Sequence, residues 1–204
     1  LDSGEIPACF FNIIDPENDS IKTLTHVAGD PFSLPAHSIK CIYTDSYGNI
    51  WAGSIRDGLI GVSSSKMATH SDVHIGMHTG LSNPTVLCLY QGTNSEDIWI
   101  GTDGEGLNRF NPKTHTFTHY ESTLKTKVVS IASYSQTELA ISVYGDRFWI
   151  FNKLNGKLRP MPVNDPELNY QVKYASVSIN ICNENDGTLM LFGRMLYRYD
   201  RTTG

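Results

Sequence analysis

The sequence of 204 residues predicts an all-β fold. The first observation is a hydrophobic period of two, in runs of about five residues such as 86–90 and 98–102. The second is that Gly, Asn, Asp or Pro bounds these runs, as expected for short strands joined by turns. No window of eleven or more residues carries a convincing amphipathic helical pattern. Short antiparallel strands are therefore the expected elements.

The third observation is an internal repeat. Residues 98–110 repeat residues 50–62 with Trp99 on Trp51, and the two tryptophans are 48 positions apart. Two weaker copies follow, with Ala140 and then Met190 at the tryptophan position, after 41 and 50 further residues. A period of about 40–50 residues is typical of the four-stranded blades of a β-propeller. The predicted fold is therefore a β-propeller of four-stranded antiparallel blades.

The blade limits follow from this period. We predict the C-terminal half of a blade in 1–33, blades in 34–79, 80–124 and 125–174, and an incomplete blade in 175–204. Seventeen strands result: two near the start (about 9–14 and 20–26), twelve in the complete blades and three at the end. Because seven blades need roughly 315 residues, we expect these four to four and a half blades to be a fragment of a seven-bladed propeller. Closure as a small ring, completed by the N-terminal strand, is the alternative.

Eight residues of the repeat are predicted to have structural roles. Asp45 and Gly48 shape the turn at 45–49, because a carboxylate accepts backbone N–H groups and glycine adopts a positive φ. The two tryptophans are expected to be buried packing residues. Glycines beside them let a neighbouring backbone approach closely. The repeated glycines are Gly53, Gly58, Gly101 and Gly106.

Composition excludes several classes of function. Sixteen Lys and Arg against 21 Asp and Glu give a net charge of −5, and the absence of a basic run argues against nucleic-acid binding. The four cysteines show neither a C-x-x-C pair nor metal-ligand spacing, so Cys41 and Cys88 are interpreted as buried small hydrophobes. No apolar stretch reaches the ~18 residues of a membrane span, and no leader opens the chain. We expect a soluble region of a longer protein, with no cofactor and no bound metal.

The residue patterns resemble a known repeat. Segment 45–59 contains, in this order, Asp, Gly-Asn, Trp-x-Gly and Gly-Leu, and segment 97–107 contains part of the same pattern. Segments 34–39 and 80–86 resemble the Gly-Leu-Pro-x-Asn-x-Val sequence with which the known repeat opens. This is the two-component regulator propeller repeat of periplasmic sensor regions in bacterial hybrid two-component histidine kinases. The resemblance implies seven-bladed propellers, an oligosaccharide or other small ligand and a homodimeric receptor anchored in the inner membrane. It also implies that this region lies on the periplasmic side and signals to transcription.

Candidate ligand-binding residues lie in two kinds of connection that emerge on one face of a propeller: those between blades, and those between second and third strands. Loops on a rigid scaffold commonly carry function. Tyr144 and Arg147 stand out because the third unit abandons the Gly-x-Gly-Leu pattern there, and a broken local rule marks a candidate site. An aromatic ring stacks on a sugar, and an arginine binds a carboxylate or sulfate. The full set is His37, Arg56, Asp57, His78, Asp103, Glu105, Tyr144, Asp146, Arg147 and Arg194.

Other functions remain open at this point. His70, His74 and His78 share one face with Asp72 if the segment is a strand, but an outer strand with a polar face explains the pattern without a metal. The sequence contains none of the common hydrolase, P-loop or dinucleotide motifs. We therefore expect a non-catalytic sensor. A protein-interaction scaffold and a glycan-cleaving propeller, whose Asp-box the turn at 45–51 loosely resembles, are the alternatives.

Overall fold

The computed structural model describes residues 10–27, 30, 33–34, 38–62, 69–72, 80–92, 95–174, 180–183 and 188–203, with only the backbone of 10, 62 and 69–72. Within these residues, seventeen strands form five antiparallel sheets, and the predicted number of strands is confirmed. The first sheet is a hairpin of β1 (Phe10–Asp15) and β2 (Ser20–Thr25).

Three four-stranded sheets follow, each in simple up-and-down order. Blade 1 contains β3 (Ile39–Thr44), β4 (Ile50–Ser54), β5 (Leu59–Val62) and β6 (Thr69–Asp72). Blade 2 contains β7 (Val86–Gln91), β8 (Ile98–Thr102), β9 (Leu107–Asn111) and β10 (Thr116–His119). Blade 3 contains β11 (Val128–Ser133), β12 (Glu138–Val143), β13 (Phe148–Asn152) and β14 (Leu158–Pro160). The final sheet, blade 4, contains β15 (Asn180–Asn183), β16 (Leu189–Phe192) and β17 (Leu196–Tyr199).

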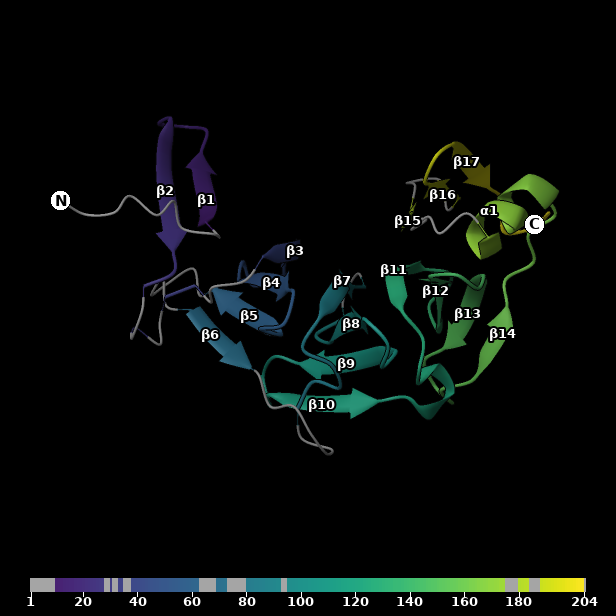
Figure 1. Cartoon of the computed structure of the whole chain (residues 1–204), viewed down its shortest axis with the longest axis horizontal. Coiled ribbons are helices and arrows are strands. Elements are labelled where there is room, and N and C mark those ends of the chain that lie inside the picture. The colour runs from purple at the N-terminus through teal and green to yellow at the C-terminus, as the bar shows by residue number, and fades with distance from the viewer. Residues whose placement is uncertain are drawn as a thin grey trace.

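The sheets are arranged as an open arc of propeller blades (Figure 1). The first strand of each blade, β3, β7, β11 or β15, lies on the concave side, and β6, β10 and β14 lie on the convex side. Neighbouring inner strands contact one another along the arc. In the described residues β2 pairs with β1 and with no strand of blade 4. Closure as a small ring through the N-terminal strand is therefore wrong, and the arc is open.

Apolar side chains fill the space between successive sheets. One cluster joins blade 1 to blade 2 through Trp51, Val86 and Phe110, and another joins blade 2 to blade 3 through Trp99 and Val128. Trp51 is 8% exposed and Trp99 is 4% exposed. The ring of Trp99 lies 5.6 Å from Tyr120 and 5.7 Å from Phe151 of the next blade. Burial of these large apolar surfaces holds neighbouring blades together.

Two glycines on the second strands give room for this packing. A Cβ atom at Gly53 would lie 2.4 Å from Cγ1 of Val86, and one at Gly101 would lie 2.4 Å from the carbonyl oxygen of Val128. Both contacts are with the inner strand of the following blade. A larger residue at either position would therefore push two blades apart.

The turn after β3 is organised by the carboxylate of Asp45, which is 5% exposed. Its Oδ1 accepts hydrogen bonds from the backbone N–H groups of Tyr47 (2.9 Å) and Asn49 (2.8 Å). Its Oδ2 accepts from Nδ2 of Asn49 (3.0 Å) and the indole of Trp51 (2.9 Å). Burial opposes ionisation, but the hydrogen bonds from Trp51, Asn49 and Tyr47 outweigh it and lower the pKa of Asp45. Gly48 completes the turn with a φ of +80°.

Helix α1 (Pro166–Tyr174) was not expected from the sequence and lies in the connection between β14 and β15. Its start has ordinary signals, since Asp165 caps it by accepting the N–H of Leu168 at 2.8 Å and Pro166 occupies the first turn. Leu168 and Val172 pack into the cluster between blades 3 and 4. In the described part of the chain no helix is long and apolar enough to span a bilayer.

Candidate functional site

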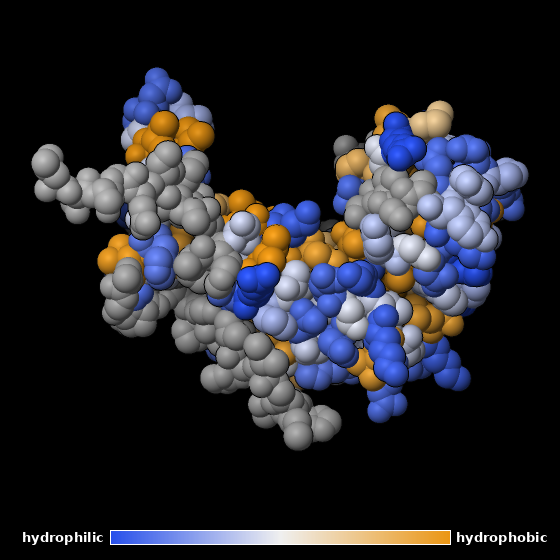
Figure 2. Space-filling view, viewed as in Figure 1, coloured by the Kyte–Doolittle hydropathy of each residue, from blue (hydrophilic) through white to orange (hydrophobic). Residues whose placement is uncertain are grey.

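A hollow on the concave side, here called the inner cavity, has a volume of about 570 Å³. All four inner strands contribute to it, so it lies where the blades converge. Figure 2 shows the concave side of the arc between its two ends, with hydrophobic and hydrophilic residues side by side. Its lining residues are Lys40, Cys41, Leu87, Cys88, Leu89, Asp103, Lys127, Val129, Ser130, Tyr144 and Asn180.

Part of the polar lining of the inner cavity is a cluster of Asp103, Lys127 and Tyr144. Lys127 Nζ lies 2.7 Å from Asp103 Oδ1, and this carboxylate raises the pKa of Lys127. The backbone N–H of Tyr144 donates to the carbonyl of Lys127 at 2.9 Å, so the turn after β12 is fixed to the start of β11. Tyr144 is 37% exposed. The cluster thus presents an aromatic ring beside an ion pair.

Two thiols line the apolar part of the cavity. Burial raises the pKa of Cys41 to about 12, and burial raises the pKa of Cys88 well above its usual value. Both thiols are therefore protonated at neutral pH, which makes them poor nucleophiles and poor metal ligands. They are partly buried, whereas Cys182 is exposed.

The structure brings together only some of the residues selected from the sequence. Asp103 and Tyr144 both line the inner cavity. Asp146 and Arg147 instead line a second hollow of about 310 Å³, the helix cavity, together with residues of α1. Tyr144 and Arg147 were both selected from the broken repeat, but they line different cavities because a tight turn directs them apart.

The remaining candidates that the structure describes line neither cavity. Arg56 is exposed at φ +82°, and the backbone N–H of Asp57 donates to Ser54 within the same turn. Glu105 accepts a hydrogen bond from Ser82 through its carbonyl oxygen, and Arg194 occupies the turn between β16 and β17. His37 and His78 lie outside the described residues, as does His74 of the histidine segment. Among the residues that are described, no group of three or more His, Cys, Asp or Glu side chains could hold a metal ion.

Sequence reasoning selected Arg147 of the helix cavity but missed lysines in both cavities. Lys127 immediately precedes β11 and so lies in a connection between two blades, the kind of connection for which His37 was selected from the sequence. The rule that such connections hold candidate residues would therefore have selected Lys127 as well. Lys173 of the helix cavity had no such signal, because α1 itself was not expected.

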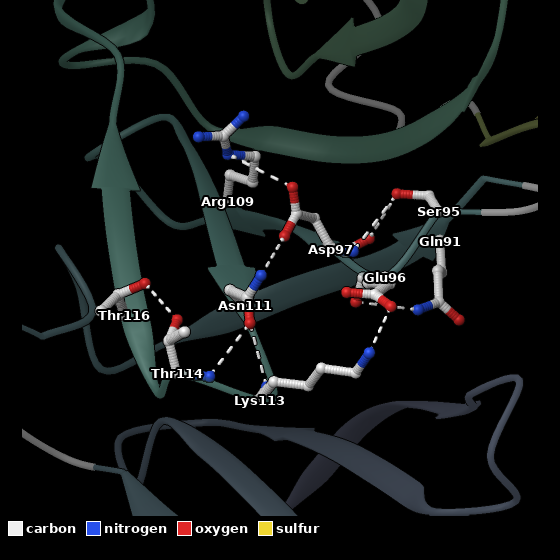
Figure 3. Close-up of polar contacts among 9 residues, drawn as sticks. All are labelled: Gln91, Ser95, Glu96, Asp97, Arg109, Asn111, Lys113, Thr114 and Thr116. Carbon is white, nitrogen blue, oxygen red and sulfur yellow. Dashed lines mark hydrogen bonds and ion pairs between the residues drawn. The ribbon is translucent and has the colours of Figure 1, made fainter.

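The turns between first and second strands and between third and fourth strands carry a polar network with a structural role (Figure 3). Glu96 contacts Lys113 within blade 2 and accepts from the hydroxyl of Tyr47 of blade 1 at 3.2 Å. Asp97 accepts from Nδ2 of Asn111 at 2.9 Å and lies 3.7 Å from Nε of Arg109. This network joins the short turns of blades 1 and 2 and contains no cavity-lining residue.

The sheets, their packing and the inner cavity define the region as an open arc of β-propeller blades. The family model described as two component regulator propeller matches residues 33–56, the segment that carries β3 and β4. The predicted resemblance to this repeat is confirmed. No curated protein matches the chain.

Solved structures share the fold over most of the chain. An extracellular domain described as part of a hybrid two component system from Bacteroides thetaiotaomicron superposes with a TM-score of 0.73 at 14% identity, covering 89% of this chain and 25% of that one. A second such domain, described as part of a one component system from the same organism, gives 0.70 at 20% identity, covering 93% and 25%. Virginiamycin B lyase from Staphylococcus aureus gives 0.66 at 14% identity, covering 95% and 63%. The chain thus spans about a quarter of the length of the first two structures.

Proposed function

We propose that this chain is a ligand-sensing, non-catalytic propeller region of a two-component receptor, and that it takes an oligosaccharide in the inner cavity. The observation that carries the proposal is the match of residues 33–56 to the two component regulator propeller model, on a fold similar to extracellular domains of such systems. The full receptor is then a membrane-anchored homodimeric histidine kinase, with this region on the periplasmic side of the inner membrane.

The inner cavity has the size and chemistry for a sugar. Its volume of about 570 Å³ lies within the ~300–1,000 Å³ of typical ligand sites. Tyr144 offers an aromatic face for stacking, and the ion pair of Lys127 and Asp103 offers a donor and an acceptor to hydroxyl groups. The raised thiol pKa values leave no activated nucleophile among the two cysteines, which argues against catalysis through a cysteine.

Signalling by such a ligand requires a difference in affinity. A ligand shifts an equilibrium between receptor arrangements only by binding one of them more tightly. The inner cavity meets this requirement because four separate sheets supply its walls, so its shape depends on the angle between blades.

Calorimetry against a panel of neutral and acidic oligosaccharides tests the proposal. We expect a member of the panel to bind, and Tyr144→Ala to weaken that binding by about three- to tenfold, since aromatic contacts contribute about 0.5–1.5 kcal/mol. Asp103→Asn is expected to weaken it as well. Tyr170→Ala is the matched control, because Tyr170 is 60% exposed on α1 and does not line the inner cavity.

Three outcomes oppose the proposal. Absence of binding across the panel removes the sensing role. Co-elution of a purified protein partner without glycan binding supports the interaction scaffold instead. Release of shorter products from a polysaccharide supports a glycan-cleaving propeller.

A further inference from the structure

The helix cavity is bounded by two segments of blade 3 that depart from the repeat: the turn after β12 and the connection that contains α1. Its walls come from the turn after β12, from the residues after β14 and from α1. In the turn, Arg147 occupies the position that Gly106 has in blade 2. The two turns close with the same hydrogen bond, from Val143 N–H to the Arg147 carbonyl at 3.1 Å and from Thr102 N–H to the Gly106 carbonyl at 3.0 Å.

Blade 2 has no room for a side chain at this position. Gly106 has a φ of +70°, and a Cβ atom there would lie 2.2 Å from the carbonyl oxygen of Thr123 in the connection to blade 3. The N–H of Gly106 also donates to the carbonyl of Thr126 at 3.0 Å, which seats the turn directly on that connection. In blade 2 the turn therefore packs directly on the connection to the next blade, whereas in blade 3 a hollow remains at the equivalent place.

In blade 3 the following connection contains α1, and a hollow of about 310 Å³ separates it from the turn. Two cationic side chains from separate elements line this hollow, Arg147 from the turn and Lys173 from the last turn of α1. Asn169, one helical turn before Lys173, adds an amide group to the lining. Buried Phe148 and Met161 form its apolar floor.

Asp146, the single acidic residue among the described residues of the lining, is engaged within the turn. Its Oδ2 accepts the indole N–H of Trp149 at 2.8 Å, and its Oδ1 lies 3.4 Å from Nε of Arg147. The guanidinium carbon of Arg147 lies 5.6 Å from the centre of the Trp149 ring, which orients the side chain further. The contact with Asp146 uses Nε, whereas carboxylates and sulfates bind best to the two-nitrogen fork of a guanidinium. Arg147 is thereby pre-oriented for an anion.

We propose that the helix cavity is a binding site for a small anion, a carboxylate or sulfate, either free or carried by a sugar, held between Arg147 and Lys173. Two cations facing a single neutralised carboxylate give the hollow a net positive charge, and the apolar floor suits the ring of an acidic sugar. This site is separate from the inner cavity and does not depend on the function proposed for it.

Nuclear magnetic resonance of the ¹⁵N-labelled protein tests the site with glucuronate, glucose and inorganic sulfate. We expect glucuronate and sulfate to shift the Nε–H signal of Arg147 and the backbone signal of Asn169, and glucose to leave both unchanged. Arg147→Gln and Lys173→Gln should each lower the affinity for the binding anion about tenfold, because each removes a charge-assisted contact. Lys157→Gln, an exposed cation that does not line the helix cavity, is the matched control and should have no effect.

The outcomes separate the possible occupants. Shifts with sulfate alone support the site with a free anion or sulfate ester, and shifts with glucuronate alone support a sugar carboxylate. Equal shifts with glucose and glucuronate overturn the proposal, as does anion binding that survives both glutamine variants. If Arg147→Gln perturbs the turn, Lys173→Gln still decides the result, since its side chain lies on the exposed surface of α1.

Discussion

Asp45→Asn is expected to destabilise the protein through an unavoidable mismatch of donors. Each carboxylate oxygen of Asp45 accepts two hydrogen bonds, Oδ1 from Tyr47 and Asn49 and Oδ2 from Asn49 and Trp51. An asparagine has one acceptor oxygen, so in either orientation its NH₂ group faces two donors. An unsatisfied buried donor costs about 1–3 kcal/mol, so two such donors give a loss of about 2–6 kcal/mol in the free energy of unfolding.

Urea unfolding followed by tryptophan fluorescence measures this loss, because the indole of Trp51 is one of the four donors. Asp15→Asn is the matched control, since Asp15 accepts in a similar way from Glu17 and Asn18 but at the exposed tip of the β1–β2 hairpin. It should cost less than about 1 kcal/mol. A loss for Asp45→Asn no larger than that of the control would refute the reasoning.

The same carboxylate predicts a dependence on pH. Because the folded state lowers the pKa of Asp45, its contribution is complete above the unfolded pKa of about 3.9 and is lost as the pH falls through the folded value. The difference in stability between the wild type and Asp45→Asn should therefore be complete at about pH 6 and shrink as the pH falls below about 4. A difference that stays constant over this range would contradict the assignment of the charge to the turn.

Three further predictions concern the blade interfaces and the thiols. Gly101→Ala should lower the free energy of unfolding by about 3 kcal/mol, because its Cβ would lie 2.4 Å from the Val128 carbonyl oxygen. Gly48→Ala, with φ +80° and open space around its Cβ, should cost about 1–2 kcal/mol. Equal losses in thermal or urea unfolding would exclude the clash at Gly101. Ser130→Ala should lower the free energy of unfolding by about 1–3 kcal/mol and speed hydrogen exchange in β15. The reason is that Ser130 Oγ accepts from the N–H of Ile181 at 2.9 Å and donates to the carbonyl of Ile181 at 3.3 Å. Unchanged exchange at Ile181 would argue against this link. In a Cys9→Ser background iodoacetamide should label Cys182 well before Cys41 and Cys88, because burial raises the pKa values of these two thiols. Similar labelling rates for all three would contradict the burial of Cys41 and Cys88.

The strands were predictable because their signals are local. A period of two between turn residues identifies β7 to β10 nearly to the residue, and the repeat carries the same assignment to neighbouring blades. Helix α1 was missed because its nine residues are shorter than the window searched and bury only three side chains. Its capping residue Asp165 and the proline after it were the available signals.

The candidate site was only partly predictable. The broken repeat at 144–147 drew attention to a turn that lines two cavities. Sequence proximity gives no side-chain direction, so it could not separate Tyr144 from Arg147. Lys127 and Lys173 come close to these residues only through packing between blades and against α1, which depends on contacts far apart in sequence.

The arc is built as a series, because each apolar cluster joins one sheet to the next. In such a series a strain at one interface relaxes locally, and distant blades move almost independently. The inner cavity departs from this rule, since its walls include residues from β3, β7, β11 and β15 at once. A molecule that fills the inner cavity would contact all four blades and so restrict motion at the three interfaces between them. The size of this molecule would then set the curvature of the arc.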